Sequence, residues 1–315
     1  MTRFLLVGNG RPLEEVCQAI PRLGGEVAGV YANPESARRL QAMGIDPQQS
    51  SILRAPEAAE VIRAQRIDWL LNVQSQVVFP AAVIRAPALG AINFHPGPLP
   101  EGAGLTAHEW AVILGESAFA ATLHYMTPDL DAGPIIVRRD FEISDTDTGL
   151  TLLAHAWRVG TELLCDLLPS LIAGQRPSAY AQDKSKFRYF PGKPPHGGRI
   201  DVSWPADRIL NFVRALQYYP LQSPSGPPRL VVNGEPFAVL QAERGESSSG
   251  HSPPGKITEV SERGVQIAVS GHESVWIIRL LREGSPVAAG PFFQRHGISA
   301  GALCDTELPA SSGRP

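Results

Sequence analysis

Residues 91–100 read A-I-N-F-H-P-G-P-L-P. The apolar beginning of this segment predicts a buried strand over residues 91–94. Because side chains alternate along a strand, we expect Asn93 and His95 to lie on the same side. Pro96 cannot donate a ladder hydrogen bond and favours an extended residue before it, so we expect the strand to end at His95. The sequence therefore predicts an amide and an imidazole side by side at the end of a central strand, where open α/β sheets place their active sites.

Strand and helix patterns alternate on both sides of this segment. Apolar runs predict strands at residues 3–7, 26–31, 69–73, 120–125 and 134–141. Helical spacing of apolar residues and helix-start signals predict helices at residues 12–23, 34–43, 55–65, 107–114 and 150–173. Strands that alternate with helices are typical of an α/β fold with a doubly wound, mostly parallel sheet.

The chain is long enough for two domains, and we predict four segments. Residues 1–174 form the α/β domain, and residues 175–205 are rich in Pro, Gly and Lys, which is typical of a linker. Residues 206–303 begin with a helix and continue with short β-like runs and Gly-containing turns, which predict a small OB-like β-barrel. We expect the tail at 304–315 and the loop at 244–254, which contains S-S-S-G, to be disordered.

Composition indicates a soluble globular protein. Hydrophobic residues make up 43% and charged residues 19% of the 315 residues, which is typical of that class. No apolar run reaches the roughly 18 residues that span a bilayer, and F-L-L-V-G at 4–8 is too short for a signal-peptide core. We therefore expect a cytoplasmic protein without a membrane partner. Cys17, Cys165 and Cys304 are far apart, so we expect no disulfide framework and no zinc site.

The charge of the chain bears on its partners. The net charge is −3, and residues 205–303 carry nine Lys and Arg against eight Asp and Glu. Proteins that bind tRNA normally present a basic face to the phosphates. The charge distribution therefore argues against a tRNA partner.

A second motif follows the first, because Asp131 lies in the run D-L-D-A-G-P. N-x-H-P followed by L-P and then by D-x-G resembles the folate-dependent formyltransferase family. This family includes methionyl-tRNA, glycinamide ribonucleotide and amino-sugar formyltransferases and the formyltetrahydrofolate hydrolases. The resemblance covers residues 70–174 and continues more weakly through R-I-D-V-S-W-P-A at 199–206 and N-F-V-R-A-L at 211–216.

The resemblance implies that Asn93, His95 and Asp131 are catalytic and that 10-formyltetrahydrofolate is the formyl donor, with no metal. Formyl transfer places negative charge on the formyl oxygen, and the Asn93 amide is a candidate donor to that oxygen. His95 is a candidate general base or proton shuttle, because histidine titrates near neutral pH. Asp131 is a candidate for orienting the imidazole and stabilising its charged form, and it also fits an Asx-turn before Gly133.

The resemblance further implies a pterin pocket between residues 72–80 and residues 127–133, held largely by backbone groups. Apolar wall and backbone amides would come from Val73, Val77, Val78, Phe79, Leu130 and Ala132. Both segments also fit ordinary core-facing loops. His108 and His124 stay outside the catalytic set, because each fits a structural histidine at least as well as a residue that contacts substrate.

The acceptor side departs from one branch of the family. Methionyl-tRNA formyltransferases follow the His-Pro motif with Ser-Leu-Leu-Pro and then Tyr-Arg-Gly, whereas residues 97–105 here read G-P-L-P-E-G-A-G-L. This form is closer to formyltransferases of natural-product pathways, including siderophore and nonribosomal-peptide clusters. We therefore expect a small amine acceptor, such as a hydroxyornithine-like amino acid or an amino sugar, or a carrier-bound amino acid.

Two other functions stay open. A formyltetrahydrofolate hydrolase would use water in place of the amine, and a non-catalytic module would bind folate or a carrier protein. The combination of Asn93, His95 and Asp131 suits acyl transfer in general, so a different acyl donor fits these residues too. The C-terminal domain is a candidate surface for a homodimer.

Overall fold

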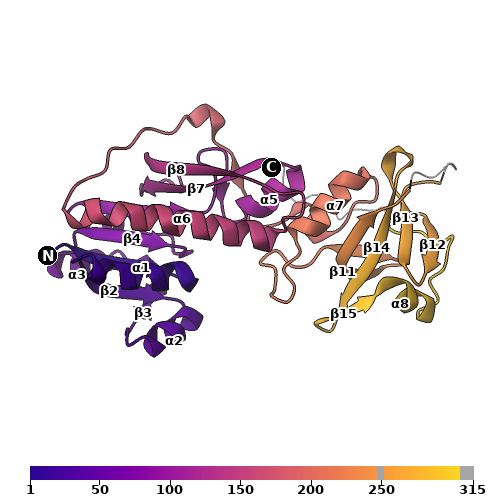
Figure 1. Cartoon of the computed structure of the whole chain (residues 1–315), viewed down its shortest axis with the longest axis horizontal. Coiled ribbons are helices and arrows are strands. Elements are labelled where there is room, and N and C mark those ends of the chain that lie inside the picture. The colour runs from indigo at the N-terminus through magenta and orange to yellow at the C-terminus, as the bar shows by residue number, and fades with distance from the viewer. Residues whose placement is uncertain (247–251, 306–315) are drawn as a thin grey trace. The chain divides into compact units, whose positions relative to one another are not determined.

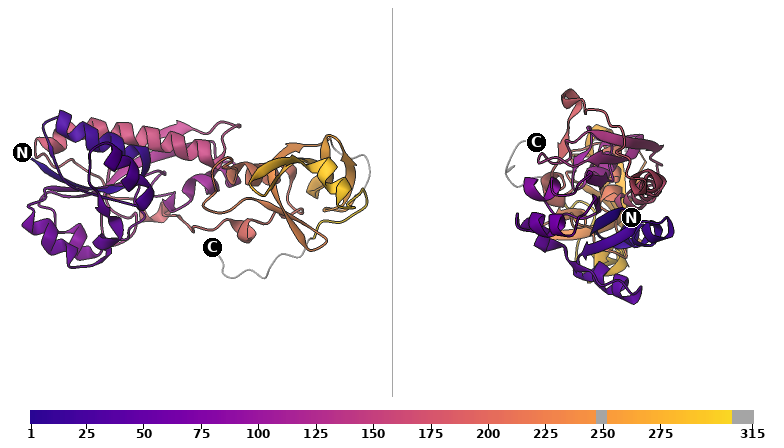
Figure 2. Two further views of the ribbon diagram at one scale, coloured as in Figure 1. Left: turned by 90° about the horizontal axis from the view of Figure 1, so that it is seen from below. Right: turned by 90° about the vertical axis from the view of Figure 1, so that its left-hand side faces the viewer.

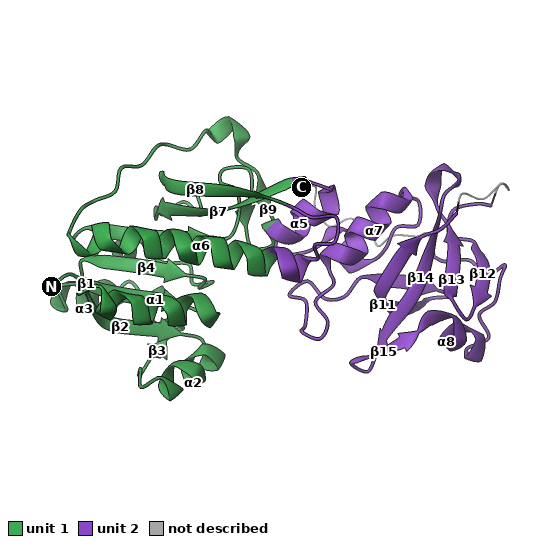
Figure 3. Ribbon diagram, in the orientation of Figure 1, with its two compact units in different colours: residues 1–107, 118–142, 153–190 green, residues 108–117, 143–152, 191–315 purple. Residues whose placement is uncertain are grey.

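The computed structural model describes residues 1–246 and 252–305, which divide into two units (Figure 1, Figure 2 and Figure 3). Unit 1 contains residues 1–107, 118–142 and 153–190, and unit 2 contains residues 108–117, 143–152 and 191–315. Residues 175–190, which we predict to be linker, therefore belong to unit 1. Each unit combines three separate stretches of chain, so the predicted ranges 1–174, 175–205 and 206–303 stay predictions.

A seven-stranded sheet forms the centre of unit 1. Its strands are β1 (Arg3–Gly8), β2 (Glu26–Ala32), β3 (Gln48–Gln49), β4 (Trp69–Val73), β5 (Gly90–His95), β7 (Ala118–Tyr125) and β8 (Ile135–Glu142). Their order across the sheet is β3-β2-β1-β4-β5-β7-β8. The neighbours from β3 to β5 pair in parallel, whereas β5 with β7 and β7 with β8 pair antiparallel. The predicted α/β fold with a mostly parallel sheet is confirmed.

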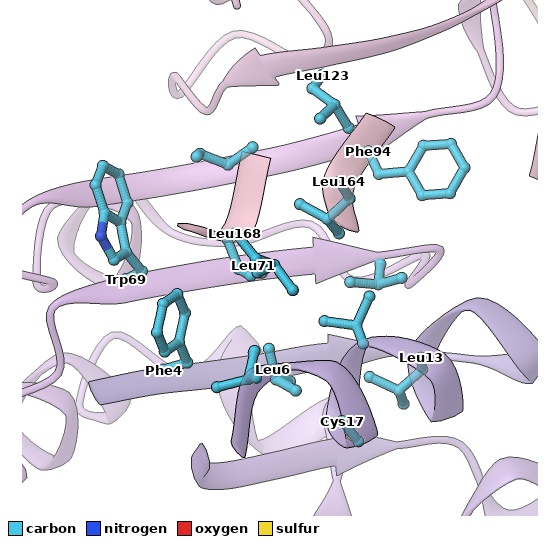
Figure 4. Close-up of a cluster of buried hydrophobic side chains, with 14 of the residues drawn as sticks. Phe4, Leu6, Leu13, Cys17, Trp69, Leu71, Phe94, Leu123, Leu164 and Leu168 are labelled. Carbon is cyan, nitrogen blue, oxygen red and sulfur yellow. The ribbon is translucent and has the colours of Figure 1, made fainter. Parts of the chain in front are cut away.

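Helices cover both faces of this sheet. They are α1 (Gly10–Arg22), α2 (Pro34–Ala42), α3 (Ala58–Ala64), α4 (Ala81–Ile84) and α6 (Gly149–Ile172), of which residues 149–152 belong to unit 2. Apolar residues of α1 and α6 share one core with Phe4, Leu71 and Phe94 (Figure 4). Apolar residues of α3 and α4 share a second core with Leu5 and Leu70. Neighbouring residues of β1 and β4 thus serve opposite faces, which explains their continuous apolar runs.

A tight helix–sheet contact in unit 1 lies beside the residues that the sequence singles out. Phe94 of β5 is buried in the core that α6 covers. A β-carbon placed on Gly160 of α6 would lie 1.9 Å from the Phe94 ring. The Phe94 ring therefore occupies the space that any side chain at position 160 would need. Since Asn93 and His95 flank Phe94, this contact fixes the strand that carries them.

We expect the substitution Gly160→Ala to destabilise the protein by about 1–3 kcal/mol, because overpacking outweighs the roughly 1 kcal/mol of helix propensity that alanine adds. Urea unfolding of the variant measures this change. The control is the same substitution in a Phe94→Leu background, where the shorter side chain leaves room and the added cost should largely disappear. An equal cost of Gly160→Ala in both backgrounds would contradict the packing argument.

An antiparallel sheet forms the centre of unit 2. Its strands are β10 (Arg229–Val232), β11 (Glu235–Arg244), β12 (Ile257–Ser261), β13 (Gly264–Ala268), β14 (Ser274–Arg282) and β15 (Ser285–Ala288). The order is β10-β11-β14-β13-β12, and β15 pairs with β14. Isolated bridges join Val232 to Cys304 and Lys256 to Leu303. Residues 303 and 304 therefore pair with residues at both edges of this sheet, in β10 and just before β12. The predicted small barrel is thus a curled antiparallel sheet. Helices of this unit are α5 (Ala107–Leu114, from His108 onward), α7 (Ala206–Ala215) and α8 (Ala289–Arg295).

Several short elements escaped the sequence patterns. They include α4, α8, β15 and the two-residue strands β3, β6 (Ala103–Gly104) and β9 (Tyr189–Phe190), of which β6 and β9 pair with each other. Elements of this length carry too few residues to show a period.

The segments expected to be disordered fall partly outside the described residues. Cys304 and Asp305 of the predicted tail donate backbone hydrogen bonds to Gly255 and Val231, whereas residues 306–315 lie outside the description. Residues 247–251 of the predicted loop also lie outside it, and Arg244 belongs to β11. Among residues 1–246 and 252–305, no helix has the length and apolar character to cross a membrane.

Candidate active site

Three polar side chains lie in one row across the unit 1 sheet. Asn93 of β5 is in register with Asn72 of β4 on one side and with His124 of β7 on the other. Residues in register on neighbouring strands present their side chains to the same face. His95 ends β5, as Pro96 predicts, and is in register with Thr122. The sheet itself therefore brings the predicted amide and imidazole together with a second amide and a second imidazole.

Hydrogen bonds join the members of this row. The Asn72 Nδ2 donates to Asn93 Oδ1 over 2.8 Å, and Asn93 Nδ2 lies 2.9 Å from His124 Nε2. The Asn72 amide is itself held, because its Oδ1 accepts from the backbone N–H of Ser75 over 3.2 Å. The side chain of Asn93 thus contacts a polar partner through each end of its amide.

The protonation of His124 follows from its surroundings. Its Nδ1 lies 2.9 Å from the backbone oxygen of Tyr125, which can only accept, so Nδ1 carries the hydrogen. Burial lowers the pKa of His124 to about 4, and the nearby Asp131 carboxylate opposes this shift only in part. His124 is therefore neutral near pH 7, with its lone pair on Nε2.

His95 is held between two acceptors. Its Nε2 lies 2.7 Å from the backbone oxygen of Gly102, and its Nδ1 lies 3.7 Å from Asp131 Oδ1. A β-carbon at Gly97 would lie 2.6 Å from the same Nε2, so only glycine lets the turn after β5 close over the ring. The Gly102 oxygen can only accept, so Nε2 donates to it, and the Asp131 carboxylate lies on the Nδ1 side of the ring.

Asp131 reaches the row from the loop before β8. Its backbone has a φ of +53°, in the left-handed region that Asp tolerates better than most residues. Its Oδ2 accepts from the backbone N–H of Gly104 over 3.1 Å, and its Oδ1 lies 3.8 Å from His124 Nε2. The carboxylate therefore faces both imidazoles, and the structure brings all three predicted catalytic residues together.

The segment predicted as linker holds the Asp131 loop in place. Gln182 Nε2 donates to the backbone oxygens of Asp131 and Gly133, each over 2.7 Å. On either side of Gln182, Tyr180 bridges to Ile135 and β9 pairs with β6. The segment is thus bonded to the loop that carries Asp131 and to the one that contains Gly102 and Gly104.

Sequence reasoning missed three residues of this arrangement. His124 stays outside the predicted set because the register between β5 and β7 cannot be read from one strand. Asn72 ends an apolar run and has no motif of its own, and Gln182 lies in a segment with linker composition. The alternation of Thr122 and His124 along one strand was the single available signal for His124. His108 contacts Tyr218 within unit 2, over 2.6 Å, which favours its structural interpretation.

The six residues proposed for the pterin pocket differ in their exposure. Val73, Val77 and Phe79 are buried in the two cores of unit 1. Val78 and Leu130 are 63% and 48% exposed, and Ala132 is half-buried. The side chains of Val78 and Leu130, and in part that of Ala132, are therefore accessible to a ligand, and the pocket stays a prediction. Among the described residues, no group of three or more His, Cys, Asp or Glu side chains could hold a metal ion.

We expect Gln182→Ala to loosen the Asp131 loop, because each lost hydrogen bond contributes about 1 kcal/mol. Amide hydrogen exchange of residues 129–133 should accelerate by about tenfold or more as local opening becomes easier. Gln175→Ala is the control, since Gln175 is exposed on the same segment. Unchanged exchange at residues 129–133 in the Gln182→Ala variant would show that these two hydrogen bonds do not hold the Asp131 loop.

The pKa of His124 predicts an acid-sensitive fold. The unfolded chain binds a proton at this residue near pH 6.5 and the folded chain only near pH 4, so stability falls as pH decreases through this interval. A His124→Gln variant lacks this titration. Its free energy of unfolding should fall by about 3 kcal/mol less than that of the wild type between pH 7 and pH 4. Denaturant unfolding at several pH values measures both slopes, and identical slopes would refute the neutral assignment.

Comparison with known proteins identifies the family of the chain. Residues 5–168 match the profile of the formyl transferase family, and residues 194–297 match that of the formyl transferase C-terminal domain. A methionyl-tRNA formyltransferase of Trichlorobacter lovleyi is 30% identical over 261 residues, which cover 82% of this chain and 79% of the relative.

Solved structures share the fold. The N-formyltransferase of Helicobacter canadensis, crystallised with folinic acid and dTDP-3-aminofucose, aligns with a TM-score of 0.67 at 15% identity and covers 88% of this chain and 99% of its own. HypX of Aquifex aeolicus in complex with tetrahydrofolic acid aligns with a TM-score of 0.59 at 18% identity, covering 93% of this chain and 47% of its own. The resemblance seen in the motifs is confirmed, and the chain belongs to the formyl transferase family.

Proposed function

We propose that this enzyme transfers a formyl group from 10-formyltetrahydrofolate to an amine at the site formed by Asn93, His95 and Asp131. The observation that carries the proposal is the convergence of these side chains at the end of β5, with His95 Nδ1 3.7 Å from Asp131 Oδ1. Membership of the formyl transferase family supports the reaction. The folate ligands of the two structural neighbours support the donor.

Asn93 would stabilise the charge that develops on the formyl oxygen. When bound, 10-formyltetrahydrofolate supplies the formyl group from its N10 atom. A new bond forms between the amine nitrogen and the formyl carbon, and the bond from that carbon to N10 breaks. An N–H donor held in place before the reaction stabilises the resulting oxygen charge without reorganisation. The Asn93 amide is such a donor, because its neighbours on β4 and β7 hold it.

His95 would move the proton that the amine loses. Its Nε2–H is occupied by the Gly102 carbonyl, so the free lone pair of the neutral ring is on Nδ1. A proton taken up at Nδ1 faces Asp131, whose negative charge stabilises the imidazolium. From there the proton passes to N10 of the leaving group, which restores the neutral ring and balances the reaction.

The proposed acceptor is a small amine or a carrier-bound amino acid. The absence of a Tyr-Arg-Gly run after the His-Pro motif and the near-neutral charge of residues 205–303 support it. Methionyl-tRNA is the second candidate, because curated relatives carry that activity. Exposed Lys184 and Lys186 also add positive charge to the segment beside the Asp131 loop. A formyltetrahydrofolate hydrolase is the third candidate. It would transfer the formyl group to water and would need no amine.

An assay of tetrahydrofolate release tests the proposal. Release from 10-formyltetrahydrofolate should depend on an amine in a panel of amino acids, hydroxylated ornithines, amino sugars and methionyl-tRNA. We expect Asn93→Ala to lower kcat by about 10²–10³-fold through loss of the donor, and His95→Asn by about 10²–10⁴-fold through loss of proton transfer. Both variants should stay folded, which thermal unfolding checks.

The matched control for His95→Asn is His272→Asn. His272 is exposed and has a φ of +60°, which asparagine adopts readily, so its activity should equal that of the wild type. Release without any amine would identify a hydrolase, and release with methionyl-tRNA alone would replace the small-amine proposal. A fully active His95→Asn variant would refute the assigned proton transfer.

A further inference from the structure

The hydrogen bonds around Asn93 form a chain with a fixed direction. The Tyr125 backbone oxygen can only accept, so His124 Nδ1 donates and His124 Nε2 accepts. The atom of Asn93 that lies 2.9 Å from Nε2 must then be the donor Nδ2. The other end of the Asn93 amide is consequently Oδ1, which receives the Asn72 N–H over 2.8 Å. Each bond in the chain determines the orientation of the next.

This direction excludes the flipped amide. A rotation of the Asn93 amide by 180° would place its oxygen against the lone pair of His124 Nε2 and its NH2 group against the N–H of Asn72. Both bonds would be lost in a buried environment, where Asn72 and His124 are 7% and 2% exposed, and where unpaired polar groups are costly. Asp131 Oδ1 lies 3.8 Å from the same Nε2, beyond hydrogen-bond distance, so Asn93 is the partner of Nε2.

The orientation leaves one N–H of Asn93 for substrate. Nδ2 carries two hydrogens, and one of them is used by His124. Among the described residues no second acceptor of the Asn93 NH2 group is found, and Asn93 is the half-buried member of the row. The second Nδ2 hydrogen of Asn93 is therefore on the residue of the row that a bound molecule can reach.

We propose that His124 is a positioning residue for formyl transfer, which acts by holding the Asn93 amide in the orientation that directs an N–H toward the formyl oxygen. This inference rests on the proposed function. His124 acts as a neutral acceptor, and it neither takes up the amine proton nor contacts the formyl group. The two imidazoles of the site thus have different tasks, His95 in proton transfer and His124 in orienting the amide.

Two substitutions distinguish the effect of losing the acceptor atom of His124 from the effect of losing its ring. In His124→Gln the terminal oxygen of the side chain can replace Nε2 as acceptor, whereas His124→Leu has no acceptor at all. We expect His124→Leu to lower kcat by about 10–100-fold, part of the loss that removal of the donor itself causes, with KM for the folate changed by less than about threefold. His124→Gln should recover kcat to within about fivefold of the wild type, by retaining the hydrogen bond.

A double-mutant cycle with Asn93→Ala distinguishes positioning from a structural role. If His124 acts through Asn93, His124→Leu should change kcat by less than about twofold once Asn93 is alanine, because no amide remains to orient. Equal losses in the two backgrounds, or full activity of His124→Leu, would overturn the proposal. Should His124→Leu fail to fold, the same cycle with His124→Gln and the matched variant His124→Asn, whose shorter side chain cannot reach Asn93, gives the same discrimination.

An NMR measurement tests the inference independently of turnover. In the wild-type protein at pH 7, the ¹⁵N shifts of His124 should identify a neutral ring protonated on Nδ1. The side-chain NH2 group of Asn93 should show one hydrogen-bonded proton, which is lost in His124→Leu. An imidazolium, or a ring protonated on Nε2, would overturn the proposal. If the wild type releases no tetrahydrofolate but the NMR result is as expected, the proposed function fails and the amide orientation stands.

Discussion

The contact between the Phe94 ring and α6 at Gly160 fixes the strand that carries Asn93 and His95. Phe94 has Asn93 before it and His95 after it, and the three residues must alternate between the faces of the sheet. Burying the ring on the face that α6 covers forces the two polar side chains onto the opposite face. A shift of one residue would place the amide and the imidazole in an apolar core, so burial and site geometry specify the same register.

The remaining contacts of the site depend on strands that are not neighbours in sequence. Asn72 arrives on a parallel strand and His124 on an antiparallel one, and both meet Asn93 only because β4 and β7 flank β5 in the sheet. The antiparallel pairing of β5 and β7 also brings Thr122 to His95, where its hydroxyl donates to the Gly97 oxygen over 2.7 Å. The polar side chains that the sheet contributes to the site therefore gather around β5, where the pairing changes from parallel to antiparallel.

Much of this arrangement could be predicted from the sequence, because it depends on local signals. The strand end at His95 follows from Pro96, and the doubly wound fold follows from the alternation of apolar runs with helical patterns. The link of Asp131 to the same site came from a family motif rather than from spacing. The contribution of His124 could not be found, because it depends on strand order and register across the sheet. The contribution of Gln182 was hidden for a different reason, since a segment of linker composition pairs at Tyr180 and β9 with unit 1.

The contacts of residues 175–190 determine where a chimera of two members of this family could be joined. Composition places the end of the N-terminal domain after Gly174, where α6 has ended. The backbone oxygens of Asp131 and Gly133 nevertheless depend on Gln182, and Ala103 and Gly104 pair with Tyr189 and Phe190. A chimera joined after residue 174 would carry Asn93, His95 and Asp131 from one parent and Gln182, which holds the Asp131 loop, from the other. Of the positions after residue 174 and after Phe190, only a junction after Phe190 keeps Asp131 and Gln182, and the paired strands β6 and β9, in the part that comes from one parent.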